Sequence, residues 1–212
     1  MLKIEINEKE YRIPSSFDEM NLEQYCKAFY NLPKYGGDEE DKVAYYRHLK
    51  NSESIIMSRI MGEADDFCIN LPLSVYSRIL SELKFVYDSE GLLKNTRASI
   101  EIDGERYWIP NFEQMSMRQY IDADMVMKEE ENDMQYIEML AILLLRKDSK
   151  GEFEVYDDNY QDKIEKIRKL SCSIALPLVY HYYKKKEVSK KLSQVSMKVE
   201  RANQLLQNIL NS

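Results

Sequence analysis

The chain contains one stretch twice, and this duplication constrains its fold more than any other feature. Residues 4–25 read IEINEKEYRIPSSFDEMNLEQY, and residues 100–120 read IEIDGERYWIPNFEQMSMRQY. Tyr11 aligns with Tyr107 at an offset of 96, and after a one-residue deletion Tyr25 aligns with Tyr120 at an offset of 95. The ordered matches indicate an internal repeat, whose joint residues are Tyr11, Pro14, Phe17, Tyr25, Tyr107, Pro110, Phe112 and Tyr120.

The repeat continues beyond these joint residues, since residues 69–76 read INLPLSVY and residues 174–180 read IALPLVY. We therefore expect a first module over residues 1–96, a second, duplicated module over 97–187 and a separate segment over 188–212. Only 6 Gly and 5 Pro occur in 212 residues, which favours helices with short connections. The predicted fold class is α+β, mainly α-helical: two tandem pseudo-symmetric modules, each a β-hairpin plus helices, followed by a long C-terminal amphipathic helix.

Local signals define the hairpin in each copy. Apolar and polar residues alternate on both sides of Asn7 and of the Asp103-Gly104 dipeptide, which predicts two short β-hairpins. Pro14 and Pro110 are expected to end the second strands, because proline has no N–H to donate to a strand ladder.

Helices are expected after each hairpin. Asn21 with Gln24, and Ser116 with Gln119, have the three-residue spacing of a capping box, which predicts where the first helix of each copy begins.

Two further helical patterns follow, one in each copy. Residues 38–62 carry apolar side chains at helical spacing, among them Val43, Tyr46 and Leu49, and residues 132–146 are apolar nearly all round and are expected to be central. The proline of each Leu-Pro-Leu segment is expected in the first turn of a helix, where its missing N–H costs nothing.

Composition narrows the class of protein. Hydrophobic residues make up 44% and charged residues 32%, and no apolar run reaches the about 18 residues that a membrane span needs, so no membrane association is expected. Cys26, Cys68 and Cys172 are widely spaced among apolar neighbours, which is typical of reduced thiols in a protein core.

The C-terminal segment carries a heptad pattern. Its apolar positions are spaced alternately by four and three residues, which predicts a helix with a contact seam. A helix of this kind packs either on the protein's own helices or on a partner, and both alternatives are open. The seam residues are Val188, Leu192, Val195, Val199, Ala202, Leu206 and Ile209.

A basic stretch precedes and enters this segment. Residues 184–212 carry a net charge of +5 within a total of −7, so the preceding residues carry −12. Lysines beside tyrosines could bind phosphates and stack on bases, but the acidic whole and the absence of a nucleic-acid motif argue against such a partner. Lysines near a helix C-terminus also complement its dipole. The basic residues are Lys184, Lys185, Lys186, Lys190 and Lys191.

Patterns for enzyme chemistry are missing. His48 and His181 have no Cys, His or carboxylate at metal-ligand spacing, and the chain contains no phosphate-binding glycine loop and no nucleophile elbow. We therefore expect no catalytic residues, no metal and no cofactor.

The duplicated stretch resembles small morphogenesis proteins of tailed bacteriophages, among them tail-assembly chaperone-like proteins and minor virion components. The pattern that carries this resemblance is Ile4, Ile6, Tyr11, Ile13, Pro14, Phe17, Leu22, Gln24 and Tyr25, and it recurs over residues 100–120. Phe17 and Phe112 stand where Trp is expected in that family. The resemblance covers about a fifth of the chain and implies a non-enzymatic assembly or structural role.

From the resemblance we expect other phage structural or assembly proteins as partners, a possible homo-oligomer, and a location in the cytoplasm of the infected bacterial host or in the virion. The alternative function is a regulatory or anti-defence protein that binds nucleic acid or a host factor through the basic stretch.

Overall fold

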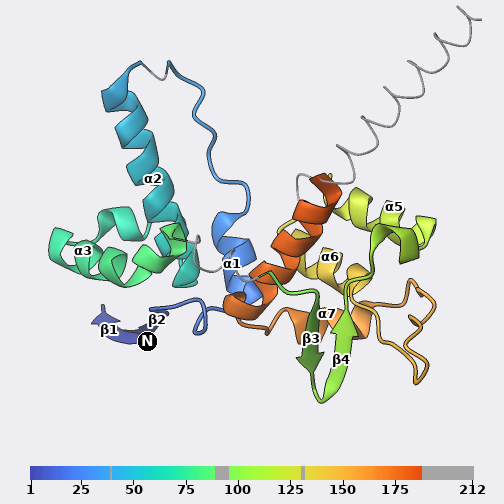
Figure 1. Cartoon of the computed structure of the whole chain (residues 1–212). Helices are drawn as coiled ribbons and strands as arrows, with labels where there is room; N and C mark the ends of the chain where they lie inside the picture. Colours follow the sequence, from blue (N-terminus) through green and yellow to red (C-terminus); the bar gives the residue numbers. More distant parts are fainter. Residues whose placement is uncertain (39, 89–95, 130–131, 188–212) are drawn as a thin grey trace, which may run out of the picture.

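The structure, a computed structural model, describes residues 1–38, 40–88, 96–129 and 132–187. The predicted fold class is confirmed at the level of α+β, mainly helical, with two separate two-stranded antiparallel sheets (Figure 1). With η marking a 3₁₀ helix, the elements are β1 (Leu2–Ile6), β2 (Lys9–Ile13), α1 (Leu22–Phe29), α2 (Lys42–Ile60), η1 (Cys68–Asn70), α3 (Leu73–Glu82), η2 (Leu83–Tyr87), β3 (Ser99–Ile102), β4 (Glu105–Trp108), η3 (Phe112–Gln114), α5 (Met117–Val126), α6 (Gln135–Leu143), α7 (Gln161–Ile167) and a helix over 172–187.

The two hairpins have the same strand register. Ile4 pairs with Tyr11 in the first and Ile100 pairs with Tyr107 in the second, which are the residues that the repeat aligns. All four are buried, because alternate side chains of each strand point toward the core. The sequence repeat therefore corresponds to a repeated structure at the two hairpins. Pseudo-symmetry of the whole modules, and their boundaries, stay predictions.

Each hairpin turns through two residues with positive φ, the geometry of a type I′ turn. The φ values are 51° and 66° at Asn7 and Glu8, and 52° and 80° at Asp103 and Gly104. Glycine adopts this conformation freely and Asn or Asp tolerates it, whereas the Cβ of a glutamate makes it costly. Glu8 is thus the residue of the four that fits its turn least well.

We expect Glu8→Gly to raise the free energy of unfolding by about 1 kcal/mol, because the left-handed conformation then carries no Cβ penalty. The measurement is urea denaturation followed by circular dichroism. Gly104→Glu is the matched reverse change, and it should lower stability by a similar amount, since no atom lies within 4 Å of an added Cβ and only the backbone conformation opposes it. Equal stability in all three proteins would contradict the argument.

The predicted capping box is complete at α1, whereas only one of its two hydrogen bonds forms at α5. At α1 the Gln24 amide donates to Asn21 Oδ1 at 2.8 Å and the Asn21 amide donates to Gln24 Oε1 at 3.2 Å, which is the full capping box. At α5 the Gln119 amide donates to Ser116 Oγ at 3.1 Å, but the Gln119 side chain donates to the carbonyl of Ile142 at 2.8 Å. The reciprocal bond predicted there is wrong, because a buried carbonyl at the end of α6 takes the amide group.

Helix α6 is central, as predicted. Its residues from Ile137 to Leu143 are almost all buried, and the core cluster around it draws side chains from both halves of the chain. The backbone leaves α6 as an extended segment that pairs with β4. The Trp108 amide donates to the Leu145 carbonyl at 2.8 Å and the Leu145 amide donates back at 3.0 Å, so the second hairpin is fixed directly to the centre of the fold.

Helix α2 is buried over only half of its length. It begins after the cap Asp41 and ends before Gly62, whose φ of 74° closes the helix as the pattern predicted. Its C-terminal half is buried, but Val43, Tyr46 and Leu49 in its N-terminal half are exposed. Figure 1 shows the reason: this half of α2 projects beyond the elements that form the core.

The two prolines of the Leu-Pro-Leu segments also occupy different places. Pro72 is the N-cap residue of α3, one residue before the predicted first turn, whereas Pro177 lies in the second turn of the 172–187 helix. The prediction for Pro177 is wrong because the chain enters that helix earlier. The Ile174 and Ala175 amides already bond to the carbonyl of Ser171, each at 3.0 Å.

Candidate interaction surfaces

The joint residues of the repeat are structural. The Tyr11 hydroxyl donates to Glu63 at 2.8 Å, and the Tyr107 hydroxyl donates to Glu105 at 2.7 Å, so each buried ring keeps a carboxylate partner for its polar tip. Burial is the first cause that raises the pKa of Tyr107 to about 12. Pro14 and Pro110, which follow the second strands, are buried, and the aromatic joint residues Phe17, Tyr25, Phe112 and Tyr120 are half-buried against the core or neighbouring rings.

Helix α1 belongs to the first copy by sequence, but its N-terminus bonds to the second copy. The Leu22 amide donates to the Leu170 carbonyl at 2.8 Å, and the Glu23 amide donates to the Arg168 carbonyl at 3.2 Å. These are the first two amides of the helix, which have no acceptor within it. The Glu23 carboxylate also lies 3.2 Å from Arg168 Nη2.

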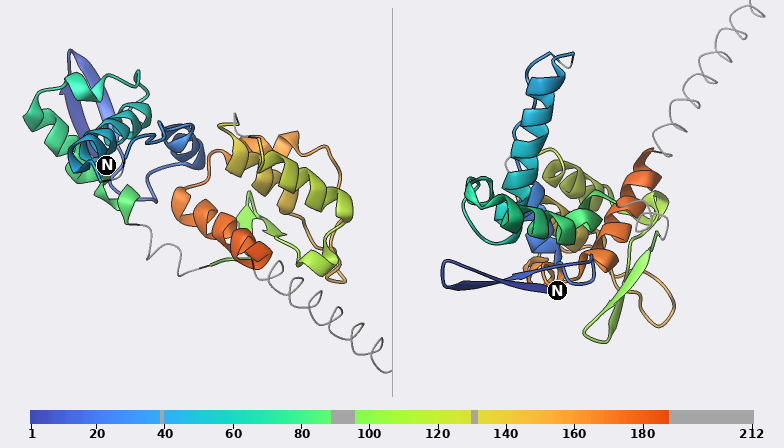
Figure 2. Two further views of the ribbon diagram at one scale, coloured as in Figure 1. Left: turned by 90° about the horizontal axis from the view of Figure 1, so that it is seen from above. Right: turned by 90° about the vertical axis from the view of Figure 1, so that its left-hand side faces the viewer.

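Further hydrogen bonds, from residues 172 and 173, join the same two regions. The Cys172 amide donates to the Met20 carbonyl at 2.8 Å, its thiol to the Asn21 carbonyl at 3.2 Å, and the Ser173 amide to the Phe17 carbonyl at 3.1 Å. We call this set of bonds between residues 17–23 and 168–173 the α1 contact. Figure 2 shows α1 between the two halves of an elongated molecule. As predicted, all three cysteines are free and buried.

Two helices present apolar stripes to solvent. Val43, Tyr46 and Leu49 lie on one side of α2, and we call them the α2 stripe. Met117, Ile121 and Met125 follow each other at intervals of four on α5, and we call them the α5 stripe. Repeated exposure along one helix face, as opposed to single exposed residues, is typical of a contact surface.

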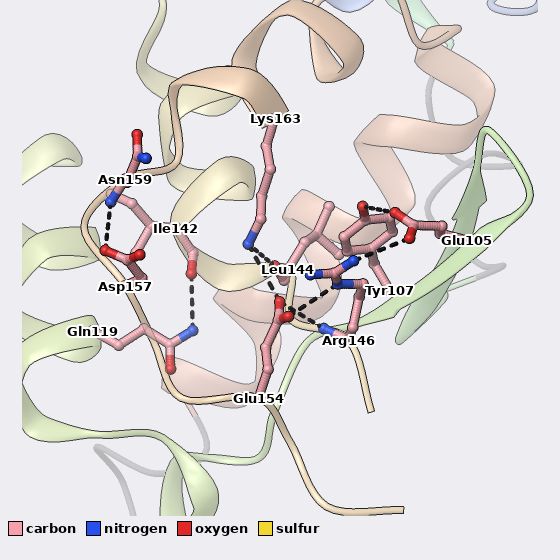
Figure 3. A network of polar contacts seen from close by, with 10 residues as sticks. All are labelled: Glu105, Tyr107, Gln119, Ile142, Leu144, Arg146, Glu154, Asp157, Asn159 and Lys163. Atoms are coloured by element: carbon pink, nitrogen blue, oxygen red, sulfur yellow. Dashed lines mark hydrogen bonds and ion pairs between the residues drawn. The ribbon is translucent and has the colours of Figure 1, made fainter. Parts of the chain in front are cut away.

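A polar network ties the second hairpin to the loop after α6 and to α7 (Figure 3). Arg146 reaches two carboxylates, with Nη1 at 3.0 Å from Glu105 Oε1 and Nε at 3.0 Å from Glu154 Oε2. Lys163 lies 3.6 Å from Glu154 Oε1 and donates to the Leu144 carbonyl at 2.9 Å. The network thus holds three segments around one partly buried carboxylate.

The pKa values in this network follow from burial and partners. Burial lowers the pKa of Lys163, since removal from water disfavours the ammonium. Burial alone would raise the pKa of Glu154, but hydrogen bonds from the amide and guanidinium of Arg146 outweigh it and the pKa is lowered. Neither of the two cavities described next is lined by these residues, so the network serves as a structural tie.

The larger cavity, of about 390 Å³, lies at the end of the 172–187 helix beside Tyr180, Tyr183 and Lys184. A smaller one, of about 160 Å³, lies between α1 and α6 beside Cys26 and Tyr136. The second is below the volume range of small-molecule sites. Cys26 lines it together with the carboxylates of Glu129 and Asp133, but burial raises the pKa of the Cys26 thiol to about 12, so this thiol stays protonated and is a poor nucleophile.

The basic stretch is only partly available to a partner. Lys185 donates to Asn111 and Lys186 pairs with Asp124, so two of the three lysines within the described residues are used by the fold. Burial also lowers the pKa of Lys185. Lys184 is exposed. Lys190, Lys191 and the whole 188–209 seam lie outside the described residues.

Within the described ranges, no group of three His, Cys, Asp or Glu side chains is arranged to hold a metal ion. Among the described helices, none combines the length and apolar character of a membrane span. Comparisons with protein-family models, curated proteins and solved structures gave no match in any of the three. The surfaces themselves are therefore the basis for a functional argument.

Proposed function

We propose that this protein is a non-enzymatic phage assembly or virion structural protein that acts through protein–protein contacts, in the cytoplasm of the infected host or in the virion. The observation that carries the proposal is the exposure of the α2 and α5 stripes. Large apolar side chains on a helix face gain free energy when a partner covers them, about 1.5–3 kcal/mol for each side chain that is fully buried. The resemblance of the duplicated stretch to phage morphogenesis proteins supports the biological setting.

The α2 stripe fits this role because of its place in the fold. It lies on the projecting half of α2, where a partner meets little obstruction from the rest of the described chain (Figure 1). The ammonium of Lys50 lies 5.8 Å from the ring centre of Tyr46. The exposed aromatic ring and the charge beside it together form an amphipathic surface. Aromatic side chains of this kind are enriched at protein interfaces.

The test is co-expression of the chain with the structural proteins encoded by neighbouring genes, followed by native mass spectrometry of the purified complexes. We expect at least one stable complex, and we expect Tyr46→Lys with Leu49→Lys to weaken it at least roughly tenfold. Arg47→Ala, on the same helix, is the matched control and should leave the complex intact. If no neighbouring protein forms a complex, the proposed function is wrong.

The seam over 188–209 stays a predicted second contact region. Leu192→Asp with Val199→Asp tests it in the same experiment, because charge within an apolar seam prevents helix pairing. Unchanged complexes would remove the seam from the proposal. The alternative of nucleic-acid binding gains no support from the described lysines, since Lys185 and Lys186 already have partners in the fold.

A further inference from the structure

The two hairpins differ in the main-chain hydrogen bonds along their edges. In an antiparallel pair of strands, every second facing pair directs its amides and carbonyls away from the partner strand. Trp108 is such a residue in the second hairpin, and it exchanges two hydrogen bonds with Leu145, at 2.8 Å and 3.0 Å. One edge of the second hairpin is therefore bonded to the centre of the fold.

The first hairpin has no such edge bonds within the described residues. Arg12 is the counterpart of Trp108 at the offset of 96, and it faces Lys3. Two positions further along the strands, Glu10 faces Glu5. By the same geometry, the amides and carbonyls of Lys3 and Glu5 point away from β2 along the outer edge of β1. Both residues are exposed, so this edge can take up a further strand.

The charges on the exposed face of the first hairpin are not balanced within the hairpin. Lys3 lies opposite Arg12 and Glu5 lies opposite Glu10, and facing pairs of like charge destabilise a sheet. Glu10 offsets both cations, since its Oε1 atom lies 3.5 Å from Lys3 Nζ and 3.5 Å from Arg12 Nε. Among the described residues, Glu5 has no ion-pair partner, so one carboxylate on β1 lacks a cation.

The second hairpin carries opposite charges at the matching pair. Glu101 faces Arg106, with Oε2 of the carboxylate 4.0 Å from Nη2 of the guanidinium. These two residues are the counterparts of Glu5 and Glu10 at the offset of 96. The hairpin that is bonded to the fold is thus balanced at this pair, whereas the hairpin with the open edge is not.

A second copy of β1 supplies both the missing hydrogen bonds and the missing cation. If two β1 strands lie antiparallel about a two-fold axis at Ile4, Lys3 of each copy faces Glu5 of the other, and their outward amides and carbonyls bond across the axis. A register centred on residue 3 or on residue 5 would instead set Lys3 against Lys3 or Glu5 against Glu5. Charge therefore selects the register centred on Ile4.

The ion pairs of the two hairpins then join into one network across the axis. Arg12, Glu10 and Lys3 of one copy and Glu5 of the second copy follow each other with alternating sign. Figure 2 shows the first hairpin at one end of the elongated molecule, away from the second half of the chain. A second copy can approach the hairpin from that end.

We propose that β1 is a contact between two copies of this chain, whose β1 strands pair antiparallel about a two-fold axis at Ile4 and join the two first hairpins into one four-stranded sheet. Because both copies use the same surface, the assembly closes as a dimer. The strand has 5 residues, so the interface is small and the association belongs to the weak class. Neither the α2 stripe nor the α5 stripe takes part, so this contact goes beyond the proposed function.

The test uses charge reversal in the full-length chain. Glu5→Lys leaves only cations at the two facing positions and Lys3→Glu leaves only carboxylates, so each variant repels its own copies. The double variant, Lys3→Glu with Glu5→Lys, restores opposite charges across the axis. Glu101→Lys, at the counterpart of Glu5 on β3, is the matched control. All of these side chains are exposed, so thermal unfolding should stay close to that of the wild type.

Sedimentation velocity from about 10 µM to about 1 mM covers the range in which so small an interface forms a dimer. We expect the wild type, the double variant and the control to dimerise alike, and each single variant alone to dimerise at least roughly tenfold more weakly. An equal mixture of the Glu5→Lys and Lys3→Glu variants should dimerise again, because the lysines of one chain then face the glutamates of the other.

Hydrogen exchange of single amides, followed by nuclear magnetic resonance, locates the contact. The Lys3 and Glu5 amides should exchange more slowly as the concentration rises, whereas the Glu101 amide, which points outward from β3, should not change. A wild type that stays monomeric at about 1 mM overturns the proposal, as does a Glu5→Lys variant that associates like the wild type or a mixture of the single variants that stays monomeric. None of these results bears on complexes formed through the α2 stripe, so the proposed function is judged separately.

Discussion

Leu22→Ala is expected to lower the free energy of unfolding by about 3 kcal/mol, while Met117→Ala, at the matching position of the repeat, changes it by less than about 0.5 kcal/mol. Leu22 is fully buried in the α1 contact, so its truncation loses transfer free energy and leaves a cavity. Met117 begins α5 with its side chain in water, and alanine at that position removes no packed contact.

The measurement is denaturant unfolding of both variants at a protein concentration low enough to keep the chain monomeric. The dilution is needed because a partner bound to α5 would add apparent stability to the wild type. Equal losses for the two variants would show that the two copies bury this helix face alike. That outcome would contradict the α1 contact.

Glu154→Leu is expected to cost about 2 kcal/mol, because one carboxylate serves three donors. Its loss leaves the Arg146 amide without that acceptor and the Lys163 ammonium with only the Leu144 carbonyl. Glu152→Leu, an exposed glutamate in the same loop, is the matched control and should change stability by less than about 0.5 kcal/mol. Lys163→Met in the Glu154→Leu background should recover part of the loss, since no half-buried ammonium is then left without its carboxylate.

The effect of Glu154 depends on pH with a definite sign. Its pKa is lower in the folded protein than the usual 4.5, so its contribution is present above that value and is lost as pH falls through the folded pKa. The difference in unfolding free energy between wild type and Glu154→Leu should therefore narrow below about pH 4.5. A difference that stays constant down to pH 3 would mean that Glu154 acts through packing and not as a charge.

Features set by neighbouring residues could be predicted from sequence. The two hairpins, the cap at Asn21, the stop at Gly62 and the central place of α6 all depend on contacts within a few residues or on a continuous apolar pattern. These signals act locally, so tertiary packing changed them little.

Features that depend on distant parts of the chain could not be predicted in the same way. The side chain of Gln119 bonds to α6 instead of its own cap, and Val43 is apolar yet exposed, because the surroundings of both are set by tertiary structure. Leu22 and Met117 are both apolar at matching positions of the repeat, so the two helix faces look alike in the sequence and both would gain from cover. Nothing local says that only one of the two copies receives it.

The α1 contact has a consequence for synthesis of the protein. The Asn21 carbonyl and the Cys172 thiol that meet there are 151 residues apart. At roughly 5–20 residues per second, a ribosome takes about 8–30 s to supply the missing partner after α1 has emerged. During that interval the nascent chain exposes Leu22 and Cys26, and closure of so long a loop is a late step of folding. The growing chain therefore exposes two helix faces in succession. The face of α1 is covered by later residues of the same chain, and the face of α5 stays exposed.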